Sequence, residues 1–220
     1  MGEKAATNDV ISALLKEMRD EDEDVRRNAC KALGKMGQRA ATNEVIGGVL
    51  NAMSDQHLYV RRDACEALGE MCKKAPTIEV INGLVNAMRD EDKYVRRSAC
   101  EALGGIGKTA VTNDVIGGLL NAMRDEDEDV RRRASEVLGG MGEKAVTNEV
   151  INDLLNAMRD EYWFTRQHAC EVIGELGEQV ARIEVSVSLI NAMRDKSKGV
   201  RDSAWKALEK MGEIAGTDEY

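Results

Sequence analysis

The sequence repeats itself every 35 residues, and this period constrains the fold more strongly than any other feature. Residues 18–34 read MRDEDEDVRRNACKALG, and variants of this segment begin at positions 53, 88, 123, 158 and 193. The register does not shift, as shown by the arginines Arg26, Arg61, Arg96, Arg131, Arg166 and Arg201. Units of this length bury their apolar faces by stacking on one another. The sequence therefore predicts a linear stack of repeats.

Each repeat contains two apolar patterns with helical spacing. The first pattern predicts a helix over about residues 8–18, with an apolar face formed by Val10, Ile11, Leu14, Leu15 and Met18. The second predicts a helix over about residues 22–35, with core positions at Val25, Ala29, Ala32, Leu33 and Met36. We therefore expect an all-α fold of twelve helices in six antiparallel pairs, without strands.

Residues that start and stop helices occur at matching places. Threonine precedes the first helix as a candidate N-cap, at Thr7, Thr42, Thr77, Thr112 and Thr147. Glycine follows the second helix, where a positive φ would end it, at Gly37, Gly107, Gly142, Gly177 and Gly212. Further glycines lie inside predicted first helices, at Gly47, Gly48, Gly83, Gly117 and Gly118. Each costs the helix about 1 kcal/mol relative to alanine, and we interpret them as close approaches between neighbouring first helices.

Together these signals predict an α-solenoid of six helix-pair repeats, wound as a right-handed superhelix. We expect one domain over residues 1–220. Its repeats would cover about 7–41, 42–76, 77–111, 112–146, 147–181 and 182–216.

The repeat resembles the HEAT repeat of the armadillo and HEAT superfamily. The resemblance is carried by an aspartate at the end of the first helix, then Val-Arg, then alanine and Ala-Leu-Gly, as at Asp20, Val25 and 32–34. It implies that the aspartates and arginines form a ladder along the array and that the second helices line a concave surface. Repeats five and six depart from the pattern at Thr165, Gln167, Asp202 and Glu209.

The terminal repeats carry polar residues where the others have small ones. Glu17 replaces an alanine found at Ala52, Ala87, Ala122, Ala157 and Ala192. Glu209 replaces a glycine found at Gly34, Gly69, Gly104, Gly139 and Gly174. Because a finite solenoid needs polar ends, we expect a capped, self-contained array. The similarity of the repeats indicates either recent duplication or consensus engineering.

The charge and cysteine content limit the partners and the compartment. The formal net charge is −9, so we expect neither nucleic acid nor an anionic membrane as a partner. The start of the chain has no apolar signal region. Four of the five cysteines share one position in the repeat, too far apart for disulfides. Buried free thiols are typical of a reducing compartment, and we expect a cytoplasmic protein.

The most metal-like motif is better explained as helix capping. Asp20, Asp22 and Asp24 imitate the start of a calcium loop, but Val25 and Lys31 occupy positions that need glycine and glutamate. Enzymes on this fold are the lower-ranked alternative. Deoxyhypusine hydroxylases bind iron through His-Glu pairs, and this sequence has no His-Glu dipeptide. We predict no catalytic residues, no metal and no cofactor.

Aromatic residues mark the one candidate site. Five of the seven aromatic side chains fall at the start of second helices, at Tyr59, Tyr94, Tyr162, Trp163 and Phe164. None lies at a predicted core position, and exposed aromatic residues are typical of binding hot spots. Gln167 and His168 fall on or beside the same predicted face.

We therefore predict a non-catalytic scaffold that binds a protein or peptide through its second-helix surface and this repeat-five cluster. Self-association through the same surface is the alternative. A third interpretation is that the rings pack over the turns without a binding role.

Overall fold

The computed structural model describes residues 8–212, in which twelve α-helices and no strand occur. The first helices of the repeats are α1 (Asn8–Glu17), α3 (Asn43–Ala52), α5 (Ile78–Ala87), α7 (Asn113–Ala122), α9 (Asn148–Ala157) and α11 (Ile183–Ala192). The second helices are α2 (Glu23–Met36), α4 (Leu58–Met71), α6 (Lys93–Ile106), α8 (Glu128–Gly140), α10 (Trp163–Leu176) and α12 (Lys198–Lys210). The all-helical prediction is confirmed.

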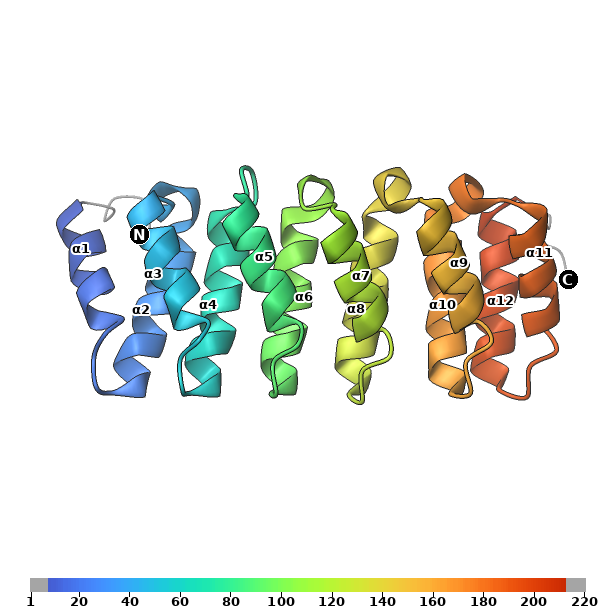
Figure 1. The fold of residues 1–220 in the computed structure, drawn as a ribbon, viewed down its shortest axis with the longest axis horizontal. Coiled ribbons are helices and arrows are strands. Elements are labelled where there is room, and N and C mark those ends of the chain that lie inside the picture. Colours follow the sequence, from blue (N-terminus) through green and yellow to red (C-terminus); the bar gives the residue numbers. More distant parts are fainter. Residues whose placement is uncertain (1–7, 213–220) are drawn as a thin grey trace, which may run out of the picture. The chain divides into compact units, whose positions relative to one another are not determined.

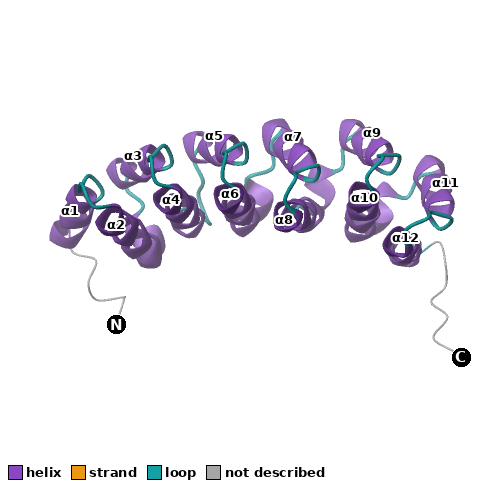
Figure 2. Ribbon diagram, turned by 90° about the horizontal axis from the view of Figure 1, so that it is seen from below, coloured by secondary structure: helices purple, strands orange, loops and turns teal. Residues whose placement is uncertain are grey.

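The chain forms two compact units, divided within α7 between Gly118 and Leu119. In each unit the odd-numbered helices form one layer and the even-numbered helices form the other (Figures 1 and 2). The second helices pack side by side, as α2 on α4 and α4 on α6 in the first unit, and α10 on α8 and α12 in the second. A single array over the whole chain remains a prediction.

The threonine caps predicted from the sequence are confirmed where they are described. In four first helices the threonine Oγ1 accepts the backbone N–H three residues later, at Thr42, Thr77, Thr112 and Thr147. Thr7 lies outside the described residues. Three second helices start with an aspartate whose side chain caps them, at Asp22, Asp92 and Asp127. The N-cap residues of α4, α10 and α12 are His57, Tyr162 and Ser197, and none of their side chains accepts a capping hydrogen bond.

The glycines after the second helices have positive φ, as predicted. Their φ values are 58–72°, and in Gly37 and Gly177 the ψ values are −143° and −137°. Residues with a Cβ rarely adopt this combination. This backbone conformation turns the chain into a short 3₁₀ helix that begins at the glycine, such as η2 (Gly37–Ala40). Repeat two has Cys72 at this position, with φ −105°.

Glycine also brings second helices together. A Cβ built on Gly69 would lie 2.8 Å from the Cβ and 2.9 Å from the Cα of Ala102, and Gly34 faces Ala67 in the same way. In the second unit, Gly174 faces Ala207 in the same way, whereas a Cβ on Gly139 would meet the Cβ of Glu175. The resulting contacts are tight because one side of each has no side chain.

Close approach between first helices explains only some of their glycines. Cβ atoms built on Gly48, Gly83 and Gly118 would lie 2.9 Å or less from side-chain atoms of the preceding repeat. Gly47 and Gly117 would meet no atom within 4 Å. The interpretation is therefore confirmed for three positions and wrong for two.

The burial predicted for the end repeats is confirmed with two differences. The alanines at the position that matches Glu17 in the other repeats are buried, and Glu17 and Glu209 are exposed. Of the glycines matching Glu209, Gly104 is exposed and the others are buried. In α1, which lies at the edge of its unit (Figure 2), no residue is fully buried and Val10 is exposed. Among residues 8–212, no helix has the length and apolar character that crossing a membrane requires.

Candidate partner-binding surface

A ladder of arginine and aspartate fixes the turns that carry the candidate residues. Arg26 donates from Nε and Nη2 to both carboxylate oxygens of Asp55 in the next repeat, at 2.7 and 3.0 Å. Its Nη1 donates to the backbone oxygens of Asp20 and Glu21 in its own turn. The pairs Arg61–Asp90 and Arg166–Asp195 repeat this geometry. These arginines are structural, as the ladder interpretation predicts.

The ladder changes the acidity of its carboxyl groups. Hydrogen bonds from Arg166 lower the pKa of Asp195 below its ordinary value. Burial alone would raise the pKa of Asp55, but the hydrogen bond from Arg26 and the backbone N–H of His57 lower it below the ordinary value. Bidentate charge-assisted pairs favour the ionised carboxylate in this way.

One rung of the ladder is broken at the aromatic cluster, which we define as Tyr162, Trp163 and Phe164. Arg131 forms no ion pair with Asp160, although the register would pair them. Its guanidinium lies 3.7 Å from the centre of the Phe164 ring, and its buried Nε has no hydrogen-bond partner. A cation over a ring at this distance is stabilising. Arg131 therefore contacts a ring in the rung where the other arginines pair with an aspartate.

The other two rings of the aromatic cluster lie on the outside. Tyr162 stacks on Phe164 with ring centres 5.3 Å apart, and Trp163 meets Phe164 edge-on at 6.1 Å. Tyr162 is 55% exposed and Trp163 is 53% exposed, whereas Phe164 is half-buried. The cluster thus has a packed base and two rings available to a partner.

Gln167 and His168 are held by a neighbouring carboxylate. Gln167 Nε2 donates to Glu171 Oε1 at 2.8 Å, His168 Nδ1 lies 2.8 Å from Glu171 Oε2, and Ser203 also donates to Glu171. Burial would raise the pKa of Glu171, but these hydrogen bonds lower it below its ordinary value. His168 is only 8% exposed. It lies deeper than the edge position that the sequence indicates.

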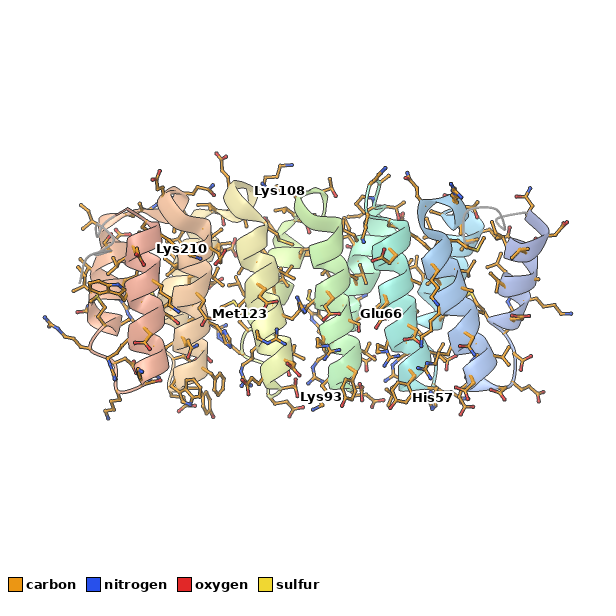
Figure 3. The ribbon with its side chains drawn as sticks, turned by 180° about the vertical axis from the view of Figure 1, so that it is seen from behind. His57, Glu66, Lys93, Lys108, Met123 and Lys210 are labelled. Carbon is orange, nitrogen blue, oxygen red and sulfur yellow. The ribbon has the colours of Figure 1, made fainter. Side chains whose placement is uncertain are left out.

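The two tyrosines of the predicted site lie in the first unit. Tyr59 is exposed and lies between the guanidinium groups of Arg27 and Arg62, at 5.2 and 5.1 Å. Tyr94 is exposed and has the ammonium of Lys93 5.4 Å from its ring centre. His57 and Lys93 mark the edge at which α4 and α6 begin (Figure 3).

A pocket opens beside the aromatic cluster, between the starts of α10 and α12. Its volume is about 770 Å³, and it is lined by residues 161–163, Arg166 and residues 196–199. Sequence reasoning identified its aromatic side but missed Lys196 and Lys198. Their signal was visible, because repeats one and four carry glutamate at both matching positions.

The sequence did not lead us to two other features, a buried carboxylate and an exposed apolar helix face. Asp63 is buried between α2 and α4, where Arg27 and Arg62 donate to its two carboxylate oxygens. On α11, three exposed apolar side chains follow one another at helical spacing, at Ile183, Val187 and Ile190. Val187 stands where every other repeat has a serine, glycine or asparagine, and this difference could have identified part of the face. Ile190 could not be recognised in this way, because the other repeats also have leucine or valine at its position.

The cysteines and acidic turns occupy structural places. All five cysteines are buried free thiols, and burial raises the pKa of Cys30 and Cys170 to about 12. Asp20 and Asp22 accept backbone N–H groups at the start of α2, as the capping interpretation predicts. Within residues 8–212, no group of three or more histidine, cysteine, aspartate or glutamate side chains is placed to hold a metal.

Family models match most of the described chain. A model for HEAT repeats matches residues 46–120 and 116–186, and a second HEAT-repeat model matches residues 10–40. The chain belongs to the HEAT-repeat family. A search of curated protein sequences gives no match.

Solved structures with similar folds are found at low sequence identity. Importin beta, crystallised in an ammonium sulfate condition, gives a TM-score of 0.74 at 21% identity, over 92% of this chain and 30% of that chain. An engineered protein gives 0.59 at 17%, over 94% and 98% of the two chains. A designed armadillo repeat protein in complex with the peptide (KR)4 gives 0.59 at 15%, over 91% and 99%. At these identities the likeness establishes the fold alone.

Proposed function

We propose that this HEAT-repeat protein is a non-catalytic scaffold that binds a protein or peptide through its second-helix surface and the aromatic cluster of repeat five. The observation that carries the proposal is the pair of half-exposed rings, Tyr162 and Trp163, beside a pocket. Large exposed rings on an immobile base lose little conformational freedom on binding and are typical binding anchors. A designed armadillo protein of similar fold was solved with a bound peptide, which supports this use of the architecture.

Contacts within the cluster and exposed rings elsewhere support its use as an anchor. Phe164 is held between Arg131 and the two outer rings. Tyr59 and Tyr94 provide further exposed rings on the first unit. Gln167 is part of the same proposed surface, whereas His168 supports it from below through Glu171.

The test is selection of binding peptides from a display library, followed by affinity measurements with Trp163→Ala. We expect binding to weaken about 30-fold, corresponding to about 2 kcal/mol for a hot-spot residue. The midpoint of thermal unfolding should hardly change, because the side chain is exposed. Trp205→Ala is the matched control, since Trp205 is also exposed but lies on α12 outside the cluster. Loss of stability with unchanged binding would show that the cluster only packs over the turn.

Self-association through the same surface is the second candidate. It is favoured by the two exposed rings themselves, which are self-complementary in a symmetric contact. Light scattering would then show a molar mass that rises with concentration, and Trp163→Ala would abolish the rise. A constant monomer mass across the concentration range would exclude it.

A further inference from the structure

We propose that the pocket between the starts of α10 and α12 binds an acidic peptide segment that also carries one apolar side chain. The apolar side chain would lie against Tyr162 and Trp163, and the carboxylates would pair with Lys196 and Lys198. This inference rests on the proposed function and specifies the partner chemistry at that surface.

Gly199 is part of the pocket lining and, unlike its counterparts in the other repeats, has no side chain. The matching residues in the other repeats are Asp24, Tyr59, Tyr94, Asp129 and Phe164. A Cβ at Gly199 would lie 2.2 Å from Oε1 of Gln167, so a larger residue there would displace the Gln167 side chain. With glycine, about 770 Å³ stays open beside Trp163.

The two walls of the pocket have different chemistry. One wall is formed by the exposed rings of Tyr162 and Trp163. The other carries Lys196 and Lys198, which are exposed and have no ion-pair partner among residues 8–212. The third cation, Arg166, is already paired with Asp195. Two lysines are therefore available to a ligand.

Lys196 reverses the charge usual at its place in the repeat, where four of the other repeats have glutamate, whereas the place of Lys198 holds glutamate in repeats one and four and Lys93 in repeat three. Where repeat six has Lys196 and Lys198, repeat one has Glu21 and Glu23 and repeat four has Glu126 and Glu128. The net charge of −9 repels acidic ligands at long range, so these lysines attract carboxylates only within about 8 Å of the pocket at physiological salt. A basic segment would be repelled there.

The rest of the surface favours a short acidic peptide over nucleic acid. Strands of nucleic acid need a continuous basic groove in addition to stacking rings. Here Glu161 lies in the same pocket lining and is exposed, so an extended polyanion would meet a carboxylate. A peptide can place its few carboxylates on the lysine side and its apolar residue on the ring side.

The experiment measures fluorescence anisotropy of a short labelled peptide with four acidic residues around a central leucine. Lys198→Glu should weaken binding about tenfold, and Gly199→Tyr should weaken it by a similar factor, because a large side chain replaces a glycine of the pocket lining. Lys144→Glu is the matched control, because it makes the same charge change at an exposed site of the second unit outside the pocket. It should leave the affinity within about twofold.

The Glu161→Gln variant tests whether the affinity changes in the predicted direction. Removal of this carboxylate should tighten binding about twofold, and an unfolded or damaged variant cannot produce a gain. Replacing the acidic residues of the peptide by glutamine, or its leucine by glycine, should each weaken binding. Unchanged affinity in any of these cases would overturn the proposal.

Other outcomes separate this inference from the proposed function. Selected peptides that depend on Trp163 but are neutral or basic would overturn the acidic ligand and leave the scaffold function standing. Tighter binding of an oligothymidylate than of the peptide would overturn the peptide assignment. Loss of the acidic peptide signal with concentration-dependent self-association would assign the pocket to a second copy, which also contradicts the proposal.

Discussion

At the scale of single residues, Phe164 decides how repeat five differs from its neighbours. The same position holds Tyr94 in repeat three, yet Arg61 there keeps its pair with Asp90. Arg131 of repeat four instead lies over the Phe164 ring of repeat five, and Asp160 has no ion pair with Arg131. An attractive ring contact has thus replaced a bidentate ion pair.

We expect a double-mutant cycle to reveal this exchange. Asp160→Asn should change the free energy of unfolding by less than about 0.5 kcal/mol in the native sequence. In a Phe164→Ala background it should cost about 1 kcal/mol or more, because Arg131 is then free to pair with Asp160. Chemical denaturation measures both values.

Asp55→Asn serves as the control for that cycle, because it breaks an intact rung in the other unit. Its cost should be the same with and without Phe164. Equal costs for Asp160→Asn in the two backgrounds would mean that the rung does not re-form.

The sequence predicted which residues form the ladder but not where it fails. A fixed register puts Tyr94 and Phe164 at the same position, and it contains no information on which way each ring turns. The same limit applies to His168, whose helical angle indicates an edge position. Its depth depends on Glu171 and on Ser203 of the next repeat, so it could not be read from spacing.

At the scale of helices, small residues set the distance between second helices. Gly69 against Ala102 lets α4 and α6 approach closely, and Gly174 does the same against Ala207. In α10 the residue at the alanine position is Val172, and Gly139 meets Glu175 instead. This difference was present in the sequence, but only the structure shows its effect on the contact.

Two glycine substitutions should therefore have opposite effects on stability. Gly69→Ala should lower the free energy of unfolding by about 1–3 kcal/mol, because its Cβ would meet backbone atoms of Ala102. Gly47→Ala should raise it by about 0.5–1 kcal/mol, because the position is helical and no atom lies within 4 Å. Urea titration of the two variants checks the signs. A shift in the same direction for both would contradict this account of the contacts.

At the scale of the whole molecule, the ladder makes stability depend on acid pH. The pKa values of Asp55 and Asp195 lie below their ordinary values in the folded chain. The unfolded chain therefore binds more protons than the folded chain just below about pH 4, the ordinary range of aspartate. The ladder contributes its full stability above that pH and loses it as the pH falls through the lowered pKa values.

We expect the free energy of unfolding to fall as the pH is lowered below about 4, and to fall less steeply in Asp195→Asn. Because protonation also relieves the repulsion among acidic residues, the comparison between the variant and the native protein is the informative measurement. Denaturant titrations across a pH series provide it. Parallel pH profiles would show that the Arg166–Asp195 pair carries none of the dependence.

The ladder also determines how such a chain can grow. Arg26, Arg61 and Arg166 each take their acceptor from the turn of the next repeat, and every repeat has the arginine and the aspartate at the same places. A repeat that is copied or removed as a whole thus leaves complete rungs on either side. The junction of α8 and α10 is the exception, because Phe164 changes the rung of whichever repeat precedes it. A copy of repeat five inserted elsewhere would carry that broken rung, and the exposed rings beside it, to its new position.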